Sequence, residues 1–312
     1  MGGPEDALTG HDNRPYVGRF APSPTGPLHF GSLVAAMASY VDARAQHGRW
    51  LIRIEDADTT RCSAAAERAI LSQLAGYGFE HDDDIVRQSE RSALYAQALE
   101  QLREGRLLFA CACSRKQLEA AARNSEGEAI YPGTCRDRQL PFASNALRIK
   151  VPAAGVDEVS FVDRAAGEYR QRLSAELGDF VLRRADGIYS YQLAVVVDDE
   201  LQGVTQVVRG VDLLGNTPRQ LHLQRCLGYR APDYLHVPLA RNAAGEKLSK
   251  QTQAAPLSLD NALVTLREAW AFLRQEPLPG AHSVREFWTQ AASNWRPERL
   301  CGHRNGGCGQ NL

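Results

Sequence analysis

The sequence predicts an α/β fold built around a parallel β-sheet. The apolar segment from Tyr16 to Phe20 predicts a short buried strand, and residues 50–55 predict a second one. Between them, helical spacing runs from about Phe30 to Gln46. A strand, a helix and a strand in this succession form a βαβ unit, which implies a parallel sheet with a right-handed crossover.

The elements around this unit follow in order. Residues 21–27, between the first strand and the helix, form a loop rich in proline and glycine. Alternation along the second strand places Arg53 and Glu55 on the same face. Helices are expected at 63–75 and 92–104, and each is followed by a glycine that favours the end of a helix.

The second half of the chain begins with a less regular stretch after residue 106. This stretch contains a group of cysteines, and we interpret it as an insertion between two halves of the sheet. Apolar runs at 191–197 and 204–208 predict two central strands. Further helices are expected over 213–227, 260–274 and 283–295.

Composition bounds the class of protein. The chain has 312 residues, of which 44% are hydrophobic and 23% charged, and its net charge of −1 does not favour general nucleic-acid binding. No apolar run approaches the roughly 20 residues that span a bilayer, and no signal-peptide pattern is present, so we expect a cytoplasmic protein without membrane association. Seven cysteines without an export signal favour buried thiols or metal binding over a disulfide framework.

Two short motifs far apart in the chain point to a nucleotide. Residues 22–32 read Pro-Ser-Pro-Thr-Gly-Pro-Leu-His-Phe-Gly-Ser, and residues 247–251 read Lys-Leu-Ser-Lys-Gln. Together they resemble the paired ATP-binding signatures of the class I aminoacyl-tRNA synthetases, whose consensus forms are His-Ile-Gly-His and Lys-Met-Ser-Lys-Ser. Ser32 replaces the second histidine, Leu248 the methionine and Gln251 the final serine, which weakens the expected roles of Ser32 and Gln251 only.

The resemblance implies how ATP is held. The N-terminus of the helix after the loop offers unpaired N–H groups and a partial positive charge to phosphates. His29 is expected to reach a phosphate, and Gly31 to leave room for adenine beside the backbone. Lys247 and Lys250 are expected to stabilise charge as pyrophosphate departs, which makes them catalytic together with His29. A capping histidine and a solvated loop lysine are the alternatives. The expected ATP contacts are Pro22, Ser23, His29, Gly31, Ser32 and Lys250.

Residues 19–26 and the Arg-Ile-Glu-Asp run that contains Glu55 resemble the glutamyl branch of the same class. Glutamate carries one ammonium and two carboxylates, so its pocket needs one acid and at least one guanidinium. Glu55 suits the ammonium, Arg19 and Arg209 suit the carboxylates, and Tyr191 offers a phenolic hydrogen bond. The alternative is that the acid and the second arginine only pair with neighbouring charges; the other charged residues of the run are expected to be scaffold. The positions that match the family's glutamate contacts are Arg19, Phe20, Ala21, Pro22, Ser23, Glu55, Tyr191 and Arg209.

A group of cysteines predicts a metal site. Cys111, Cys113 and Cys135 offer three thiolates, and Tyr131 offers an oxygen, which completes a tetrahedral shell for one structural Zn²⁺ per chain. Phenolate is an unusual zinc ligand, but the glutamyl-Q tRNA(Asp) synthetase family, which this chain resembles, has this combination of residues in this insertion. Ordinary buried thiols are the alternative. A second group, in the glycine-rich tail, lacks a fourth ligand and is expected to be flexible: Cys301, His303 and Cys308.

The length after the second motif indicates the substrate. Residues 251–312 are too few for the anticodon-binding portion of an ordinary glutamyl-tRNA synthetase, since typical domains have roughly 100–150 residues. The chain therefore resembles the shorter glutamyl-Q tRNA(Asp) synthetase family. This implies activation of glutamate by ATP with Mg²⁺, and transfer of the glutamyl group to queuosine at the wobble position of tRNA(Asp), by a monomer.

Three other functions stay open from the sequence: a truncated glutamyl-tRNA synthetase that charges a tRNA 3′ end, a non-catalytic zinc-containing RNA-binding module, and a small-molecule adenylyltransferase. The resemblance implies a Rossmann-like, parallel-sheet class I synthetase catalytic domain with a zinc-containing insertion and a short helical C-terminal part. The expected parts are the first half of the catalytic domain at 14–106, the insertion at 107–187, the second half at 188–240, the second motif with a helical region at 241–300, and a flexible tail at 301–312.

Overall fold

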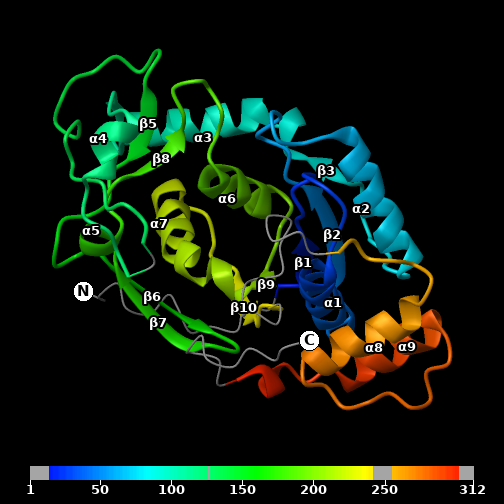
Figure 1. Ribbon diagram of the computed structural model, residues 1–312. Coiled ribbons are helices and arrows are strands. Elements are labelled where there is room, and N and C mark those ends of the chain that lie inside the picture. Colours follow the sequence, from blue (N-terminus) through cyan, green and yellow to red (C-terminus); the bar gives the residue numbers. More distant parts are fainter. Residues whose placement is uncertain (1–13, 126, 242–254, 302–312) are drawn as a thin grey trace.

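The strands form the parallel sheet that the sequence predicts (Figure 1). The computed structural model describes residues 14–125, 127–241 and 255–301. The central strands are β1 (Val17–Phe20), β2 (Arg49–Ile54), β3 (Val86–Arg87), β9 (Gln206–Gly210) and β10 (Asp233–Val237). β1, β2 and β3 pair in that order, all parallel, and β9 pairs parallel with β10. The N–H of Thr205 donates to the carbonyl of Val17 (2.9 Å), so β9 lies beside β1.

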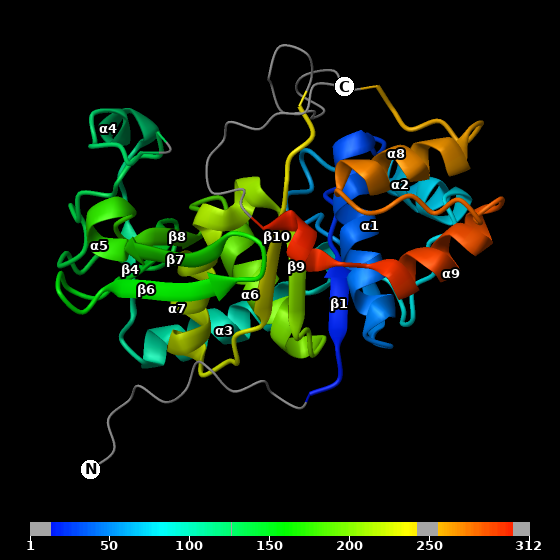
Figure 2. The same ribbon diagram turned by 90° about the horizontal axis from the view of Figure 1, so that it is seen from below.

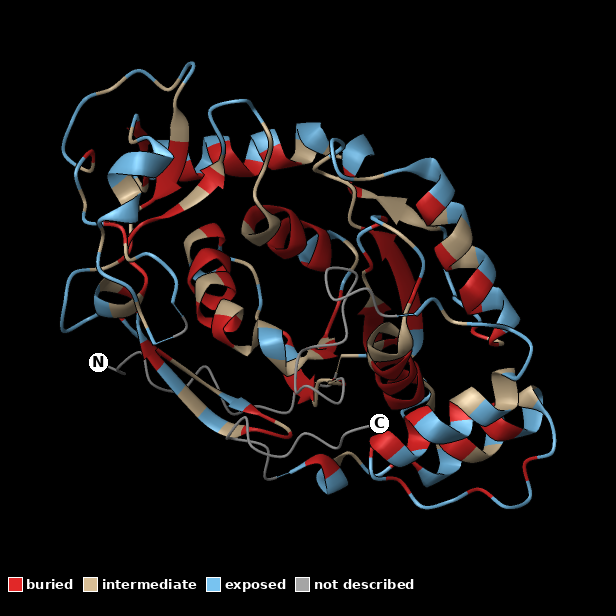
Figure 3. Ribbon diagram, viewed as in Figure 1, coloured by how far each residue is buried: buried red, intermediate tan, exposed pale blue. Residues whose placement is uncertain are grey.

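Helices cover these strands as expected. The three predicted in the first half are α1 (Phe30–Ala45), α2 (Ala64–Gly76) and α3 (Ser92–Glu104), with a 3₁₀ turn (Gln88–Glu90) before the third. His29 and Ser63 cap α1 and α2, because each side chain accepts a backbone N–H of the first turn. The centre of α1 is buried on every side (Figure 3). The sheet covers one side, and α8 (Ala262–Phe272) and α9 (Val284–Asn294) cover the other.

The segment 191–197 is helical, so the predicted strand there is wrong. α6 (Tyr191–Leu201) begins after Ser190, whose side chain accepts the backbone N–H of Leu193. Its residues from Leu193 to Asp199 are all buried, and the helix lies in the middle of the molecule (Figure 3). An apolar run is typical of a central strand and equally of a helix buried on all sides. The capping serine is the local signal that favours the helix.

The other elements predicted for the second half are confirmed. β9 begins inside the predicted strand, and α8 and α9 match the two helices expected near the C-terminus. A 3₁₀ turn (Val211–Asn216) leads into α7 (Thr217–Leu227). Gly228 ends α7 with a φ of 71°, a left-handed conformation that favours glycine. A last 3₁₀ turn covers Pro297–Leu300.

An antiparallel sheet and a hairpin occupy the stretch after residue 106. The elements are β4 (Leu108–Cys111), α4 (Arg115–Glu119), β5 (Ala146–Ile149), β6 (Glu158–Asp163), β7 (Gly167–Arg172), α5 (Leu173–Glu176) and β8 (Phe180–Arg183). The sheet has the order β4-β5-β8, whereas the β6–β7 hairpin joins the central strands because β6 pairs parallel with β10. Gly178 has a φ of 67°, and a Cβ there would lie 2.6 Å from the carbonyl oxygen of Tyr131. Glycine at this position therefore permits two loops of the insertion to meet.

Among the described helices, none combines the length and the apolar character needed to cross a lipid bilayer.

Candidate functional site

The candidate site lies beside β1, a strand that has another strand on each side. β2 pairs with β1 on one side. β9 lies on the other side of β1 (Figure 2). In open α/β sheets, ligands bind in the crevice beyond the carboxyl ends of two such strands. Arg19 is the last but one residue of β1, and Arg209 holds the same place in β9. The fold thus brings two of the predicted glutamate contacts to neighbouring strand ends.

Arg209 is a buried cation whose hydrogen-bond partners are all neutral. Its Nε donates to His236 Nε2 (3.0 Å), Nη1 to Gln220 Oε1 (2.9 Å) and Nη2 to Thr217 Oγ1 (2.8 Å). Two longer bonds, both 3.3 Å, reach the Tyr191 hydroxyl and a backbone carbonyl. Within the part of the chain that the structure describes, no carboxylate forms an ion pair with this guanidinium. Its charge is therefore available to an anionic ligand.

Arg19 belongs to a group in which the positive and negative charges balance. The members are Arg19, Arg53, Arg91, Glu55, Asp198 and Asp199. Arg19 Nε lies 3.2 Å from Asp199 Oδ1, and the same oxygen accepts a bond from Arg53 Nη1 at 2.7 Å. Arg53 also lies 3.5 Å from Glu55. Glu55 therefore has a neighbouring charge partner, which was the expected alternative to a glutamate contact. Arg53 itself is fully buried and acts as scaffold, as expected.

Glu55 lies close to the other predicted glutamate contacts. Burial raises the pKa of its carboxyl, although the charges of Arg53 and Arg19 lower it. Burial also raises the pKa of the Tyr191 phenol. The positive charges of Arg209 and Arg19 lower this pKa, and the negative charge of Glu55 raises it. Mutual shifts of this kind require short separations, because the interaction between charges falls with distance. One acid, two guanidiniums and a phenol therefore share one region of the molecule.

The loop after β1 is attached to the end of β2. The N–H of Glu55 donates to the carbonyl of Pro22 (3.0 Å). Pro22 is buried and Ser23 exposed, while Ala21 is half-buried. The Phe20 ring stacks on the buried Trp50, with 6.4 Å between the ring centroids, so its side chain belongs to the core. Any ligand contact by Phe20 would come from its backbone. Asp56, expected to be scaffold, accepts bonds from the N–H and the hydroxyl of a serine in the next loop.

The first ATP motif forms the N-terminus of α1. His29 caps the helix, because its Nδ1 accepts the N–H of Ser32 at 3.2 Å. His29 is therefore a capping histidine, which was the expected alternative to a phosphate contact. The cap also holds the His29 ring beside the unpaired N–H groups of the first turn. Gly31 and Ser32 are both half-buried in that turn. Lys247 and Lys250, the catalytic lysines expected from the second motif, lie outside the described residues.

The chain that follows the second motif returns to the first. The N–H of Leu257 donates to the carbonyl of Leu28 (2.9 Å), the residue before His29. Gln73 of α2 links the same two segments, since its side chain bonds to the N–H of Leu28 (2.7 Å) and to the carbonyl of Leu257 (3.0 Å). The sequence did not indicate this role for Gln73.

Several residues that organise the site were not predicted. They are Asp163, Asp198, Asp199, Thr217, Gln220 and His236, all buried. Asp198 and Asp199 follow an apolar run, where buried acids are uncommon unless paired. Helical spacing places them on the same side of α6 as Tyr191, seven and eight residues earlier, so a helix assignment would have found them. For the other four, the sequence carries no local signal.

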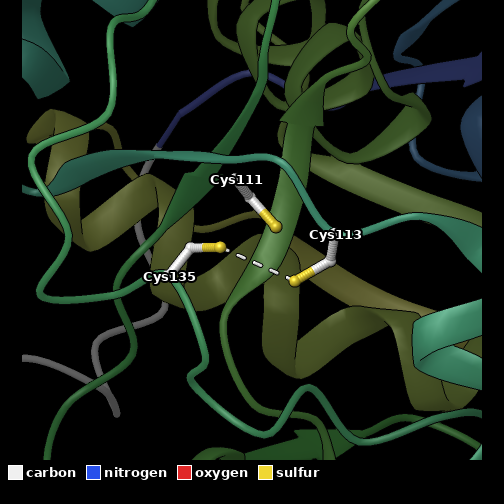
Figure 4. A group of neighbouring side chains, drawn as sticks. All are labelled: Cys111, Cys113 and Cys135. Carbon is white, nitrogen blue, oxygen red and sulfur yellow. Dashed lines mark hydrogen bonds between the residues drawn. The ribbon is translucent and has the colours of Figure 1, made fainter.

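The predicted metal ligands converge in one place. The sulfur atoms of Cys111, Cys113 and Cys135 lie within 4.8 Å of one another, and their side chains point toward a common centre (Figure 4). The Cys113 and Cys135 sulfurs are 3.6 Å apart, and the Tyr131 hydroxyl lies 3.4 Å from Cys111 Sγ and 3.8 Å from Cys113 Sγ. A tetrahedral zinc shell with Zn–S near 2.3 Å and Zn–O near 2.0 Å has edges of about 3.5–3.8 Å. The four groups therefore fit zinc.

A cation lies against this cluster. The guanidinium of Arg148 is 3.9 Å from the centre of the Tyr131 ring. Burial tends to raise the pKa of Cys111, but the hydroxyl of Tyr131, a backbone N–H and Arg148 outweigh it and lower the pKa to about 7. Burial and the neighbouring thiols raise the pKa of Cys113 to about 11. One thiolate thus forms readily, and a bound cation would favour the others. Of the tail group, Cys301 is exposed, while His303 and Cys308 lie outside the described residues.

Comparison with known proteins places the chain in a family. Residues 16–269 match the family described as tRNA synthetases class I (E and Q), catalytic domain. The chain is 52% identical over 290 residues to a glutamyl-Q tRNA(Asp) synthetase of Dechloromonas aromatica, covering 91% of this chain and 95% of that protein. It is 51% identical over 292 residues to the protein of the same name from Thiobacillus denitrificans, covering 92% and 95%.

A solved structure supports the fold. The crystal structure of a glutamate-tRNA synthetase from Elizabethkingia anophelis superposes with a TM-score of 0.76 at 23% identity. The superposition covers 92% of this chain and 67% of the other. At this level of identity the likeness concerns the fold alone, and it agrees with the predicted α/β class.

Proposed function

This chain belongs to the class I tRNA synthetases (E and Q) and, among them, to the glutamyl-Q tRNA(Asp) synthetases, and we propose that it transfers glutamate to queuosine in tRNA(Asp). In the first step a glutamate carboxylate attacks the α-phosphate of ATP, and pyrophosphate leaves. In the second, a hydroxyl of the queuosine cyclopentenediol attacks the acyl carbon of glutamyl-adenylate, and AMP leaves. The hydroxyl proton is lost as the ester forms.

The observation that carries the proposal is the charge arrangement at the strand ends. Arg209 offers a buried positive charge with neutral partners only, and Tyr191 lies 3.3 Å from it. We assign the glutamate carboxylates to Arg209 and Arg19, and the ammonium to Glu55. Two guanidiniums and one carboxylate suit an amino acid that carries two carboxylates and one ammonium. The backbones of Phe20 and Ala21, with Pro22 and Ser23, complete the proposed pocket.

ATP is assigned to the N-terminus of α1. Its first turn offers N–H groups and a partial positive charge to phosphate oxygens, and His29 is held beside them. We propose that Pro22, Ser23, Gly31 and Ser32 contact the nucleotide, which enters with Mg²⁺ on its phosphates. The catalytic assignments of His29, Lys247 and Lys250 rest on the two sequence motifs. The tie between Leu28 and Leu257 supports them, because it brings the chain after the second motif next to the first.

We propose that Cys111, Cys113, Cys135 and Tyr131 hold one structural zinc ion. Purified protein is then expected to contain about one zinc per chain, which stabilises the insertion. Cys113→Ser should lose the metal and lower Tm, as measured by atomic absorption and thermal unfolding. Cys226→Ser is the matched control, because Cys226 is a half-buried cysteine outside the cluster. Equal zinc in the Cys113→Ser and control proteins would contradict the assignment.

A labelling experiment tests the overall reaction. Incubation with ATP, labelled glutamate and tRNA(Asp) that carries queuosine should place the label in the nuclease fragment with the wobble base. The same tRNA without queuosine should stay unlabelled. Label on the 3′-terminal nucleotide would instead favour a synthetase that charges a tRNA end. Absence of glutamate-dependent pyrophosphate exchange would favour a non-catalytic RNA-binding protein.

The proposed site also bears on assembly and location. We propose that the enzyme works as a monomer, as the family resemblance implies. Because tRNA and ATP are its substrates, we place the reaction in the cytoplasm.

A further inference from the structure

Three neighbouring parallel strands carry a row of buried polar groups. Arg209 of β9 lies opposite His236 of β10 in the strand register, and Asp163 ends β6 on the far side of β10. Asp163 Oδ2 is 2.6 Å from His236 Nδ1, and His236 Nε2 is 3.0 Å from Arg209 Nε. Both the carboxylate and the imidazole are completely shielded from solvent. The row ends at the cation that we assign to glutamate.

The protons in this row have one consistent arrangement. Asp163 also accepts the N–H groups of Ala165 (2.9 Å) and Ala166 (2.8 Å), which, with His236, outweigh burial and lower its pKa. Burial lowers the pKa of His236, so the imidazole is neutral. A guanidinium N–H can only donate, so Nε2 of His236 must be the acceptor and Nδ1 must carry the proton toward Asp163. The carboxylate thus selects the tautomer that binds Arg209.

We propose that Asp163 and His236 are positioning residues for glutamate recognition, which hold the guanidinium of Arg209 in place without neutralising it. The inference rests on the proposed function, because it takes Arg209 as the contact for a glutamate carboxylate. A carboxylate in direct contact would fix the guanidinium equally well but would cancel much of its charge, as Asp199 does for Arg19 at 3.2 Å. An imidazole between acid and arginine fixes the geometry through a neutral acceptor.

Asp163→Asn tests the choice of tautomer. The amide oxygen can still accept the N–H groups of Ala165 and Ala166, but the NH₂ replaces Oδ2 and then faces His236 Nδ1, which must become an acceptor. The proton moves to Nε2, where it faces the N–H of Arg209, and the two donors repel. We expect the glutamate KM in ATP–pyrophosphate exchange to rise about 10-fold to 100-fold, and the ATP KM to change less than about 3-fold. A purely structural role would lower the amount of active enzyme without separating the two KM values.

A matched pair of variants at His236 isolates the acceptor. His236→Gln and His236→Met have side chains of similar length, and both lose the bond to Asp163. Only glutamine offers a strong acceptor for the Nε–H of Arg209, because the thioether sulfur of methionine is a weak one. The methionine variant should therefore have a glutamate KM at least about 10-fold above that of the glutamine variant. If Asp163→Asn does not fold, this pair of variants still tests whether His236 positions Arg209.

The outcomes are distinct. Equal glutamate KM values for the glutamine and methionine variants, in an active series, would overturn the positioning role and leave the proposed function standing. Absence of glutamate-dependent exchange in the unmodified protein would overturn the proposed function, and this inference with it.

Discussion

Replacing Arg209 with alanine is expected to weaken glutamate binding about 30-fold to 4000-fold, because removal of one partner from a buried charge pair costs about 2–5 kcal/mol. The guanidinium is 5% exposed and has no acidic partner among the described residues, so nothing else nearby offsets its loss. The glutamate KM in pyrophosphate exchange measures the effect. The ATP KM should change less than about 3-fold, because ATP is assigned to the N-terminus of α1 and not to Arg209.

Arg209→Lys is the matched control that separates the effect of the positive charge from that of the guanidinium geometry. Lysine keeps the positive charge but lacks the planar fork that bonds to His236, Gln220 and Thr217 at once. Its glutamate KM should lie between those of the unmodified protein and the alanine variant. An equal loss of glutamate and ATP affinity in Arg209→Ala would contradict the assigned role.

Replacing Asp198 with asparagine is expected to destabilise the protein by about 3–5 kcal/mol, because it removes the buried negative charge that pairs with Arg91. Asp198 is completely buried and accepts bonds from Arg91 (2.6 Å), Tyr95 (2.8 Å) and Gln88 (2.9 Å). These bonds join α6 to α3 and to the turn before it. Thermal unfolding should show Tm lowered by about 10 °C.

Glu100→Gln is the corresponding control on α3. It makes the same change from carboxylate to amide, but in an ion pair with Arg103 in which both side chains are about half exposed. Such pairs contribute little because water already solvates the separate charges. Its Tm should match that of the unmodified protein. If Asp198→Asn and Glu100→Gln unfold at the same temperature, the buried network does not hold α6 to α3.

Local patterns predicted most of the secondary structure. The βαβ unit and the helix ends at Gly105 and Gly228 were readable, because each depends on a few adjacent residues. The helix α6 was mistaken for a strand because its apolar run is buried on all sides, which removes the periodicity that separates the two. That error also concealed Asp198 and Asp199.

The sequence alone predicted the class of fold, and it singled out the two ATP motifs, the four proposed metal ligands and the charges of the proposed glutamate pocket. Only the tertiary structure decided which partner each arginine meets. Asp199, which balances Arg19, is 180 positions away in the chain, and Asp163 reaches His236 across 73. Such pairs depend on how α6 packs against the sheet and on the order of its strands, which no local pattern specifies. The resulting arrangement places a carboxylate against one arginine and a neutral imidazole against the other. The net charge around each arginine therefore depends on residues that are distant in the chain.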